Sequence, residues 1–429
     1  MTPSRIYEYA FRTLILFLPF ATLFSVFFRE KLGIPGISFL KELCILIMLS
    51  ILFIEHIRGK LRIIWTRYDL LMGLYAGVLI SITVFTTWLI WLIYGGRYDF
   101  SFLIVFFVVL HGFPLLSRPL GYYLKLFLIS GGIALFLSML LKWPLSEDIL
   151  LYFGYSGNPS NWQFGSAVPI FHGVEWANVR RFQGIFDGPN TMGAYLLVYM
   201  GIFTYYFRYD KQWHFMIGLF LLLFTTCIVY TYSRSALLGL VWGIGVILLL
   251  SGKYLYTHYQ KQVLSLLLLG LLGIGGILLQ YGGNIQAIIE RGGSSQGHVE
   301  RMTAGIGRFL SHPLGQWLWS AWPGYRYVLN LEKKDRTEIE KIDREYIPES
   351  WYIQQFIEGG FIWGILFILL MGVIIFWLYQ HHAILAGMFF SILIMNFFLH
   401  TFESSLISLS LFSCIGMILA SQKSHIKNV

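Results

Sequence analysis

Apolar runs long enough to cross a bilayer alternate with shorter polar connections along most of the chain. A helix needs about 20 predominantly apolar residues to span the hydrocarbon core, and the pattern repeats about 12 times. We therefore predict an all-α polytopic membrane protein in which residues 1–429 form a single integral membrane domain. The predicted spans cover residues 13–28, 37–54, 69–93, 100–117, 119–141, 187–207, 213–230, 234–250, 262–281, 351–378, 383–399 and 403–421.

Composition supports this class. The chain is 57% hydrophobic and only 12% charged, with a mean hydropathy of +0.67, whereas soluble domains carry about twice that share of charge. The first run leads into Arg29-Glu30-Lys31 without a small-residue cleavage site. We therefore expect a retained first span and not a signal peptide.

Lysine and arginine gather in alternate short connections, which the positive-inside rule places in the cytoplasm. All of them lie on one side if both termini are cytoplasmic. Two longer loops, residues 142–186 and 282–350, then lie outside. The net charge of +9 follows from this loop bias, and we predict no nucleic-acid partner. The residues concerned are Arg5, Arg12, Arg58, Lys60, Arg62, Arg67, Arg118, Arg208, Lys211, Lys253, Lys261, Lys423 and Lys427.

Metal and redox chemistry are not indicated by the sequence. Cys44, Cys227 and Cys414 all lie inside apolar runs, without the spacing of a zinc site or a disulfide framework. The chain also lacks an Asp-x-Asp pair and a cluster of His and Cys ligands. We therefore predict neither a metal nor another cofactor.

The first candidate site lies in residues 181–190, which lead into the sixth predicted span. Pro189 suits the first turn of a helix, and Asp187 is placed to cap the free N–H groups. A helix N-terminus beside Arg181 is a natural phosphate site, with Asn190 in support. A plain cap with an arginine at the membrane interface explains this fragment equally well.

The second candidate is Ser233-Arg234-Ser235, at the predicted outer start of the eighth span. An arginine at the outward end of a span runs against the positive-inside trend. Arg234 either extends to the lipid headgroups or pairs with a buried anion. Its planar guanidinium suits phosphate oxygens better than an ammonium group does.

The third candidate is the first part of the large outer loop, where Arg291, Arg301 and Arg308 occur without any lysine. Arg301 and Arg308 are seven residues apart, so one face of a helix would present both. Solvation of a surface helix is the alternative. Charges of both signs in residues 332–345 predict a solvated amphipathic helix or hairpin there.

The fourth candidate opens the tenth predicted span with Glu349-Ser350-Trp351-Tyr352. Ser350 is placed to cap the helix, and the positive end of the helix dipole favours an ionised Glu349. A carboxylate among arginines can take a proton from a reacting hydroxyl group, with Tyr352 in support. A glutamate that only complements the helix dipole is the alternative. Taken together, the four candidates predict a pyrophosphate pocket beside a base.

These motifs resemble the O-antigen ligase and O-antigen polymerase family of bacterial integral-membrane glycosyltransferases. The resemblance covers residues 181–193, residues 233–239, and the motif after the large outer loop, where Glu349-Ser350 precedes Gly360 and Trp363. The family's ligases carry histidine where this chain has Glu349. Trp363 replaces a small terminal residue, although Gly364 follows it. The carboxylate favours the polymerase branch.

The resemblance implies a GT-C-like architecture and an active site on the periplasmic face of the bacterial cytoplasmic (inner) membrane. The implied reaction is an inverting, metal-independent sugar transfer from a glycan on polyprenyl diphosphate (undecaprenyl diphosphate). The acceptor is another lipid-linked glycan in a polymerase, and lipid A-core or protein in a ligase. A flippase, a chain-length regulator and membrane lipids are the further partners implied.

Each candidate residue has a role in this reaction. Arg181, Arg234 and either Arg291 or Arg301 would bind the diphosphate and stabilise it as the leaving group, with Arg308 on the same helix face. Glu349 would orient and deprotonate the acceptor. Glu403 with His400, near the outer start of the last span, is a second candidate for acceptor binding, and a simple helix-end pair is the alternative there.

Two functions of other classes remain open. A transporter or flippase would show internal symmetry and ionisable residues in mid-membrane. No repeat relates the two halves of the sequence, and Lys41, Glu42 and Lys125 can all lie near the ends of their spans. A noncatalytic membrane assembly factor is the other alternative, and it would tolerate alanine at Glu349 and Arg234.

Overall fold

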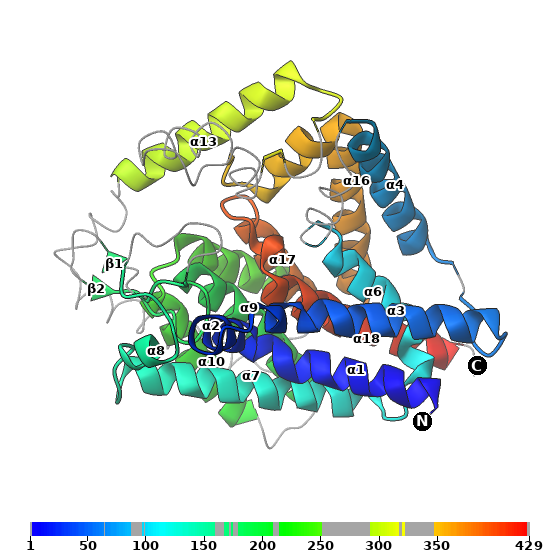
Figure 1. The fold of residues 1–429 in the computed structure, drawn as a ribbon, viewed down its shortest axis with the longest axis horizontal. Helices are drawn as coiled ribbons and strands as arrows, with labels where there is room; N and C mark the ends of the chain where they lie inside the picture. The colour runs from blue at the N-terminus through cyan, green and yellow to red at the C-terminus, as the bar shows by residue number, and fades with distance from the viewer. Residues whose placement is uncertain are drawn as a thin grey trace.

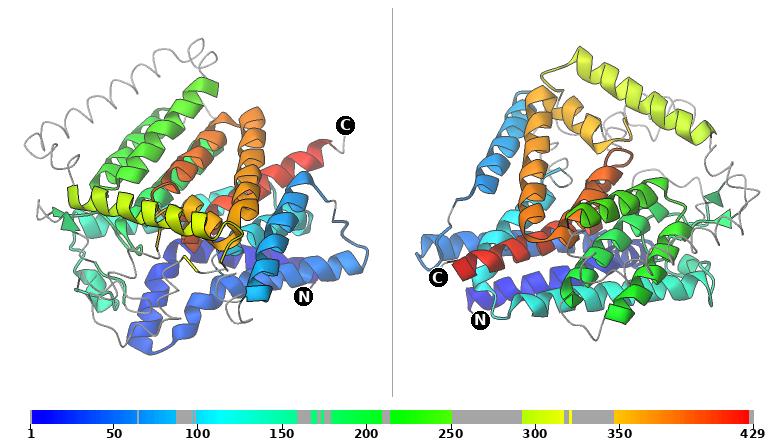
Figure 2. Two further views of the ribbon diagram at one scale, coloured as in Figure 1. Left: turned by 90° about the horizontal axis from the view of Figure 1, so that it is seen from above. Right: turned by 180° about the vertical axis from the view of Figure 1, so that it is seen from behind.

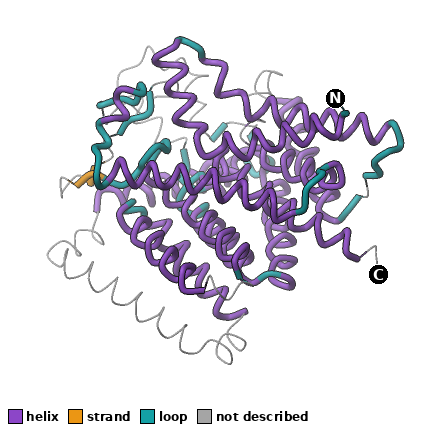
Figure 3. The backbone as a smooth tube through the Cα atoms, turned by 90° about the horizontal axis from the view of Figure 1, so that it is seen from below, coloured by secondary structure: helices purple, strands orange, loops and turns teal. Residues whose placement is uncertain are grey.

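The computed structural model is built almost entirely of helices (Figure 1). In the tube view of Figure 3, one short strand hairpin interrupts the helices of the described chain. The structure describes residues 2–426 except residues 64, 87–96, 98, 159–166, 171–172, 175–178, 209–213, 251–291, 317–319 and 322–346. The predicted span 262–281, Arg291 and the charged stretch 332–345 therefore lie outside the described residues.

The N-terminal half consists of helices joined by short turns. Its elements are α1 (Pro3–Phe17), η1 (Leu18–Phe20), α2 (Ala21–Leu32), η2 (Pro35–Phe39), α3 (Leu40–Ile57), α4 (Arg67–Thr86), α6 (Ser101–Gly112), η3 (Phe113–Leu115) and α7 (Leu120–Lys142).

The rest of the chain adds the outer-loop elements and the C-terminal helices. In order these are α8 (Ile149–Tyr152), β1 (Gly173–Val174), β2 (Val179–Arg180), α9 (Pro189–Phe207), α10 (His214–Tyr230), an apolar helix Arg234–Leu250, α13 (Gly292–Ser311), α16 (Trp351–His381), α17 (Ala383–Met395), η6 (Thr401–Glu403) and α18 (Ser405–Ile426). The two strands pair antiparallel, with Gly173 opposite Arg180.

Within the described residues, five helical stretches are long and apolar enough to cross a membrane, and four shorter apolar helices accompany them. The prediction of a helical membrane protein is thus confirmed, whereas the number of about 12 spans remains a prediction. The five stretches are Pro3–Leu32, Pro35–Ile57, Leu120–Lys142, Trp351–Gln380 and Ser405–Gln422.

The first predicted span, residues 13–28, is wrong in its bounds. The apolar helical stretch begins at Pro3 and is divided by η1, which contains Pro19. Proline has no N–H to donate and disfavours the interior of a regular α-helix, so the residues of η1 form a 3-10 turn instead. Gly33 then ends α2 in the left-handed region, with φ +67°.

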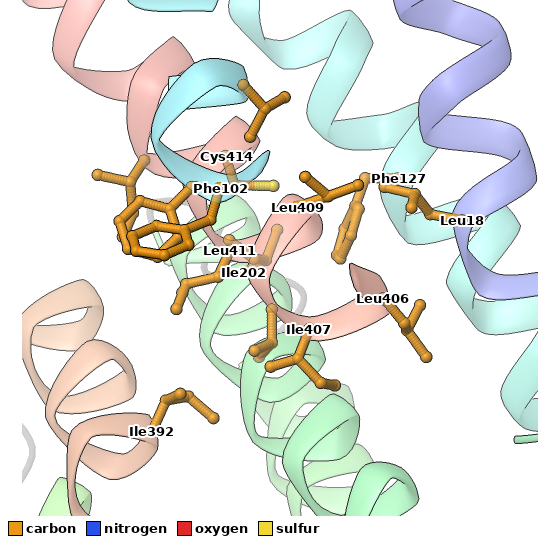
Figure 4. Close-up of a cluster of buried hydrophobic side chains, with 14 of the residues drawn as sticks. Leu18, Phe102, Phe127, Ile202, Ile392, Leu406, Ile407, Leu409, Leu411 and Cys414 are labelled. Atoms are coloured by element: carbon orange, nitrogen blue, oxygen red, sulfur yellow. The ribbon is translucent and has the colours of Figure 1, made fainter. Parts of the chain in front are cut away.

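Helix α18 lies at the centre of the packed helices. Of its most apolar 18 residues 83% are buried, against 33–44% in the other four spans. Figure 4 shows Leu406, Ile407 and Leu409 of α18 together with side chains from its neighbours. Those neighbours include Phe102 of α6 and Phe127 of α7. A helix that is apolar all round is the kind that the middle of a bundle requires.

The two ends of the chain lie at one end of the molecule's long axis, and α8 with the β1–β2 hairpin lies at the other (Figure 1). This arrangement agrees with termini on one side and the first long loop, residues 142–186, on the other. Which side is cytoplasmic remains the prediction made from the loop charges.

Helix α16 is broken at Gly360, whose φ of +72° and ψ of −170° are not helical. The turn after α13 docks on this break, because Phe361 N donates to Pro313 O at 2.9 Å and Gln316 N to Ile357 O at 3.0 Å. A Cβ at position 360 would overlap the backbone of Leu314. Figure 2 shows the result, with α13 lying across the outside of α16.

Candidate functional site

Arg181 connects three segments that are far apart in the sequence. Its Nε donates to Thr231 O at 2.8 Å, and its Nη2 donates to Asn190 Oδ1 at 2.9 Å. One residue on, Phe182 N donates to Tyr230 O at 2.8 Å. The loop before α9 is thus held against the end of α10, and Asn190 orients the guanidinium as a supporting residue.

Glycines allow these segments to approach closely. Gly184 has φ +60°, and a Cβ there would overlap Ser138. A Cβ at Gly193 would lie 2.7 Å from that of Ala236, so α9 and the helix Arg234–Leu250 are in contact at this point. The first two motifs of the sequence, residues 181–193 and 233–239, therefore lie side by side.

Ser233 and Ser235 form a polar turn at the start of the helix Arg234–Leu250. Their hydroxyl oxygens are 3.1 Å apart, and Ala236 N donates to Ser233 Oγ at 3.4 Å. Ser233 thus occupies a capping position and presents Arg234 in the first turn. A guanidinium in this half-buried place adds to the positive potential of the free N–H groups.

Glu349 pairs with two side chains of α13. One carboxylate oxygen contacts Nη1 of Arg301, and the other contacts Nδ1 of His298. The side chains of all three are 22–32% exposed, so the cluster is partly shielded from solvent. The structure thus brings the predicted base against one of the predicted diphosphate-binding arginines.

His298 was not predicted. It lies three residues before Arg301, and side chains at this spacing share a helix face. The spacing of His298 and Arg301 could be seen in the sequence. Their contact with Glu349 could not be predicted, because about 50 residues of chain separate them from it and sequence patterns are informative only over short separations.

Burial lowers the pKa of His298, and the charges of Arg301 and Arg234 lower it further. The carboxylate of Glu349 acts in the opposite direction but is shared with Arg301. His298 is therefore neutral near pH 7 and able to accept a proton. The charge of Arg234 also acts on His298, so the second and fourth motifs are linked electrostatically.

Two backbone conformations at this site are unusual. Among the described residues other than glycine, positive φ occurs only at Tyr232, with +49°, and at Glu349, with +46°. Such conformations cost free energy and tend to collect at functional sites. Tyr232 precedes Arg234 by two residues, and Glu349 is the predicted base.

The other predicted residues lie near the site in different roles. Arg308 donates to Ser320 O at 3.1 Å and contacts the side-chain oxygen of Gln316, two helical turns beyond Arg301. The hydroxyl of Tyr352 donates to Leu393 O at 3.0 Å and ties α16 to α17. Arg291 lies outside the described residues.

Two predicted caps are wrong. Ser350 occupies the N-cap position of α16, but its hydroxyl is buried and makes no capping hydrogen bond. The N-cap of α9 is Gly188, so Asp187 does not cap that helix. The first N–H of α16, that of Trp351, is satisfied by a tertiary contact, since it donates to Asn396 O at 2.9 Å.

Within the described part of the chain, no group of three or more His, Cys, Asp or Glu side chains is placed to hold a metal ion. What the site offers instead is a set of guanidinium groups around a carboxylate and a neutral imidazole. Such a site can bind an anionic group and accept a proton from a neighbouring hydroxyl. No family model and no curated protein matches this chain.

Proposed function

We propose that this protein polymerises oligosaccharide repeat units carried on polyprenyl diphosphate, at the outer face of the bacterial cytoplasmic membrane. The observation that supports this most is the ion-paired group of Glu349, Arg301 and His298 beside Arg234. It combines a proton acceptor with cations, which is what glycosyl transfer from a diphosphate requires. The resemblance to the O-antigen ligase and polymerase family supplies the substrate class.

The reaction follows from these groups. Glu349, with His298 against it, takes the proton of the acceptor hydroxyl as the hydroxyl oxygen attacks the anomeric carbon of the donor. The bond from that carbon to the diphosphate oxygen breaks, and the polyprenyl diphosphate leaves with the electron pair. Attack from the face opposite the leaving group inverts the anomeric configuration.

Arg181, Arg234 and Arg301 stabilise the charge that develops on the leaving diphosphate. Cations already in place before the reaction lower the barrier without reorganisation, and this is often the largest catalytic contribution. The backbone carbonyl of Thr231 and the side-chain amide of Asn190 hold the guanidinium of Arg181 in a fixed position before any substrate binds.

Transfer of the same glycan to lipid A-core, the ligase reaction, uses the same donor chemistry. The two functions differ in the acceptor alone, so an assay with a chosen acceptor separates them. A transporter or flippase would move the lipid-linked glycan without forming a new glycosidic bond.

The test is mass spectrometry of lipid-linked glycans after purified protein has been given polyprenyl-diphosphate-linked repeat units. A ladder of lengthened glycans on the lipid is the expected result. Transfer that occurs only after lipid A-core is added would establish a ligase instead. No new glycosidic bond under either condition would contradict the proposal and favour transport.

A further inference from the structure

A second polar cluster lies in the interior beside the candidate site, and the reaction above does not use it. Asp99 interacts electrostatically with Glu358 and with Glu403, although both glutamates follow it by more than 250 residues of sequence. We call these three carboxylates, with Gln354, Gln355 and His400, the acidic cluster. Asp99, His400 and Glu403 belong to short connections between helices on the predicted outer side, whereas Gln354, Gln355 and Glu358 belong to α16.

Hydrogen bonds join part of the acidic cluster. Gln354 Nε2 donates to Glu358 Oε1 at 3.2 Å, and His400 Nδ1 lies 3.0 Å from Glu403 Oε1. Tyr75 donates its hydroxyl to Gln355 Oε1 at 2.5 Å. The cluster is therefore built into the fold from α4, α16 and the connection between α17 and α18.

Several fully buried polar groups at this place have no hydrogen-bond partner. Asp99 lies beside Gln355, yet neither of its carboxylate oxygens, nor Gln355 Nε2, makes a hydrogen bond of good geometry. The same holds for the indole N–H of Trp351 and the amide nitrogen of Asn396. Buried polar groups are nearly always paired, so several unpaired ones in one place indicate a ligand.

These groups surround the cluster from several sides. The Trp351 ring is 6.4 Å from that of His400, and the Trp363 ring stacks on Tyr75 at 4.6 Å. The indole nitrogen of Trp363 and Nε2 of His400 are likewise buried and without a partner. Donors, acceptors and aromatic faces therefore meet within one small region.

The chemistry of this region suits a neutral ligand with many hydroxyl groups. The charges that act on Asp99 are those of other carboxylates, which repel phosphate, and Glu403 pairs with the imidazole of His400. Burial raises the pKa of Asp99 well above its usual range and that of Glu403 as well. A protonated carboxyl group donates as well as accepts, as a sugar hydroxyl does.

We propose that the acidic cluster binds a neutral sugar residue. If the proposed function holds, this sugar is the end of the glycan that supplies the acceptor hydroxyl. The chain itself connects the two sites, because Glu349 is followed directly by Ser350 and Trp351, and the Trp351 ring lies beside that of His400. Diphosphate is then bound by the arginines and sugar by the acids, with the proton acceptor between them.

Access requires movement, since Trp351, Gln355 and Asp99 are fully buried. Residues 351–359 precede the break at Gly360 and form a separate helical segment. Binding of a sugar therefore requires this segment to shift. The sugar would thus enter beside the base that deprotonates it.

The experiment is saturation-transfer difference NMR on the full chain in lipid nanodiscs, with methyl glycosides of glucose, galactose, rhamnose and N-acetylglucosamine as probes. At least one probe is expected to receive saturation from the protein. Asp99→Asn and Glu403→Gln are expected to weaken its binding about fivefold to tenfold, the usual effect of losing one hydrogen bond. The matched control is Asp69→Asn, a buried carboxylate that pairs with His111 away from the cluster.

Each outcome decides the proposal. No saturation transfer to any probe overturns it, as does unchanged binding in both cluster variants when size-exclusion profiles show that they are folded. Loss of binding in Arg234→Ala would place the sugar at the arginines and also overturn it. Sugar binding without glycan lengthening would contradict the proposed function and support the sugar site. Glycan lengthening without sugar binding would support the proposed function and contradict the sugar site.

Discussion

Glu349 contacts Arg301 from a backbone conformation that residues other than glycine rarely adopt, with φ +46°. The neighbouring chain must therefore hold the carboxylate against that strain. On one side Trp351 N is bonded to Asn396 O, and on the other α13 presents its cation. A carboxylate held in a strained conformation by contacts on both sides favours a catalytic role over a merely structural one.

Glu349→Gln should lower the rate of glycan transfer by a factor of about 10² to 10⁴, the range expected when a general base is removed. Donor binding should change little, because the arginines remain. The measurement is the rate of glycan lengthening together with binding of a polyprenyl diphosphate analogue. Glu300→Gln is the control, since Glu300 is exposed on α13, the helix that carries Arg301, and accepts a hydrogen bond from Gln296. Full activity of Glu349→Gln would exclude Glu349 as the base.

Arg234→Ala should weaken binding of a polyprenyl diphosphate analogue by about tenfold or more, since charge-assisted hydrogen bonds to phosphate are among the stronger ones. Binding can be measured by titration calorimetry in detergent. Arg180→Ala provides the comparison, because Arg180 is an outer-loop arginine that pairs with Asp148 on the surface. Equal affinity in Arg234→Ala and in the unmodified protein would remove Arg234 from the diphosphate site.

His298 should make both activity and stability depend on pH. Its pKa is lowered in the folded protein, so transfer should persist below pH ~6.5, the ordinary value for histidine. The unfolded chain binds a proton at His298 as pH falls through that value, and the folded chain resists it. Stability should therefore fall as pH falls through this range.

The variant His298→Gln should reduce that dependence of the unfolding temperature on pH and should slow transfer at every pH. Thermal unfolding monitored between pH 5 and 8 checks the first effect, and the rate profile checks the second. An unchanged rate profile in His298→Gln would show that His298 takes no part in proton transfer.

Gly360→Ala should lower the thermal stability of the protein, by about 1–3 kcal/mol in the free energy of unfolding. The φ of +72° strains any residue with a Cβ, and the added atom would overlap Leu314. Gly372→Ala, in the same helix with no atom within 4 Å of an added Cβ, should have little effect. Equal unfolding temperatures for the two variants would contradict the assigned break.

Periodicity and charge predicted much of this molecule. The apolar runs predicted the helical membrane class, and Arg301 and Arg308, expected to share one face if helical, both lie in the helix α13. The local motif around Arg181 also predicted the start of α9. In each case the decisive interactions lie within a few residues of one another, which is the range over which sequence patterns are informative.

Long-range contacts were the ones that sequence reasoning missed. Nothing near Asp99 in the chain indicates Glu358 or Glu403, and nothing near His298 indicates Glu349. The break at Gly360 was missed because glycine is common in membrane helices and its φ is fixed here by the docked turn after α13. The bond that joins Trp351, at the start of α16, to Asn396 was missed for the same reason, since the two residues are 45 apart in the chain.

The docking of α13 divides the candidate site between two parts of the molecule. Among the described helices, α13 packs mainly against α16, so Glu349, His298 and Arg301 belong to one packed unit. Arg181 and Arg234 belong to another, formed by α9, α10 and the helix that follows. The arginines proposed to bind the diphosphate are thus supplied by both parts, so a change in how α13 docks on α16 would shift Arg301 and Glu349 together.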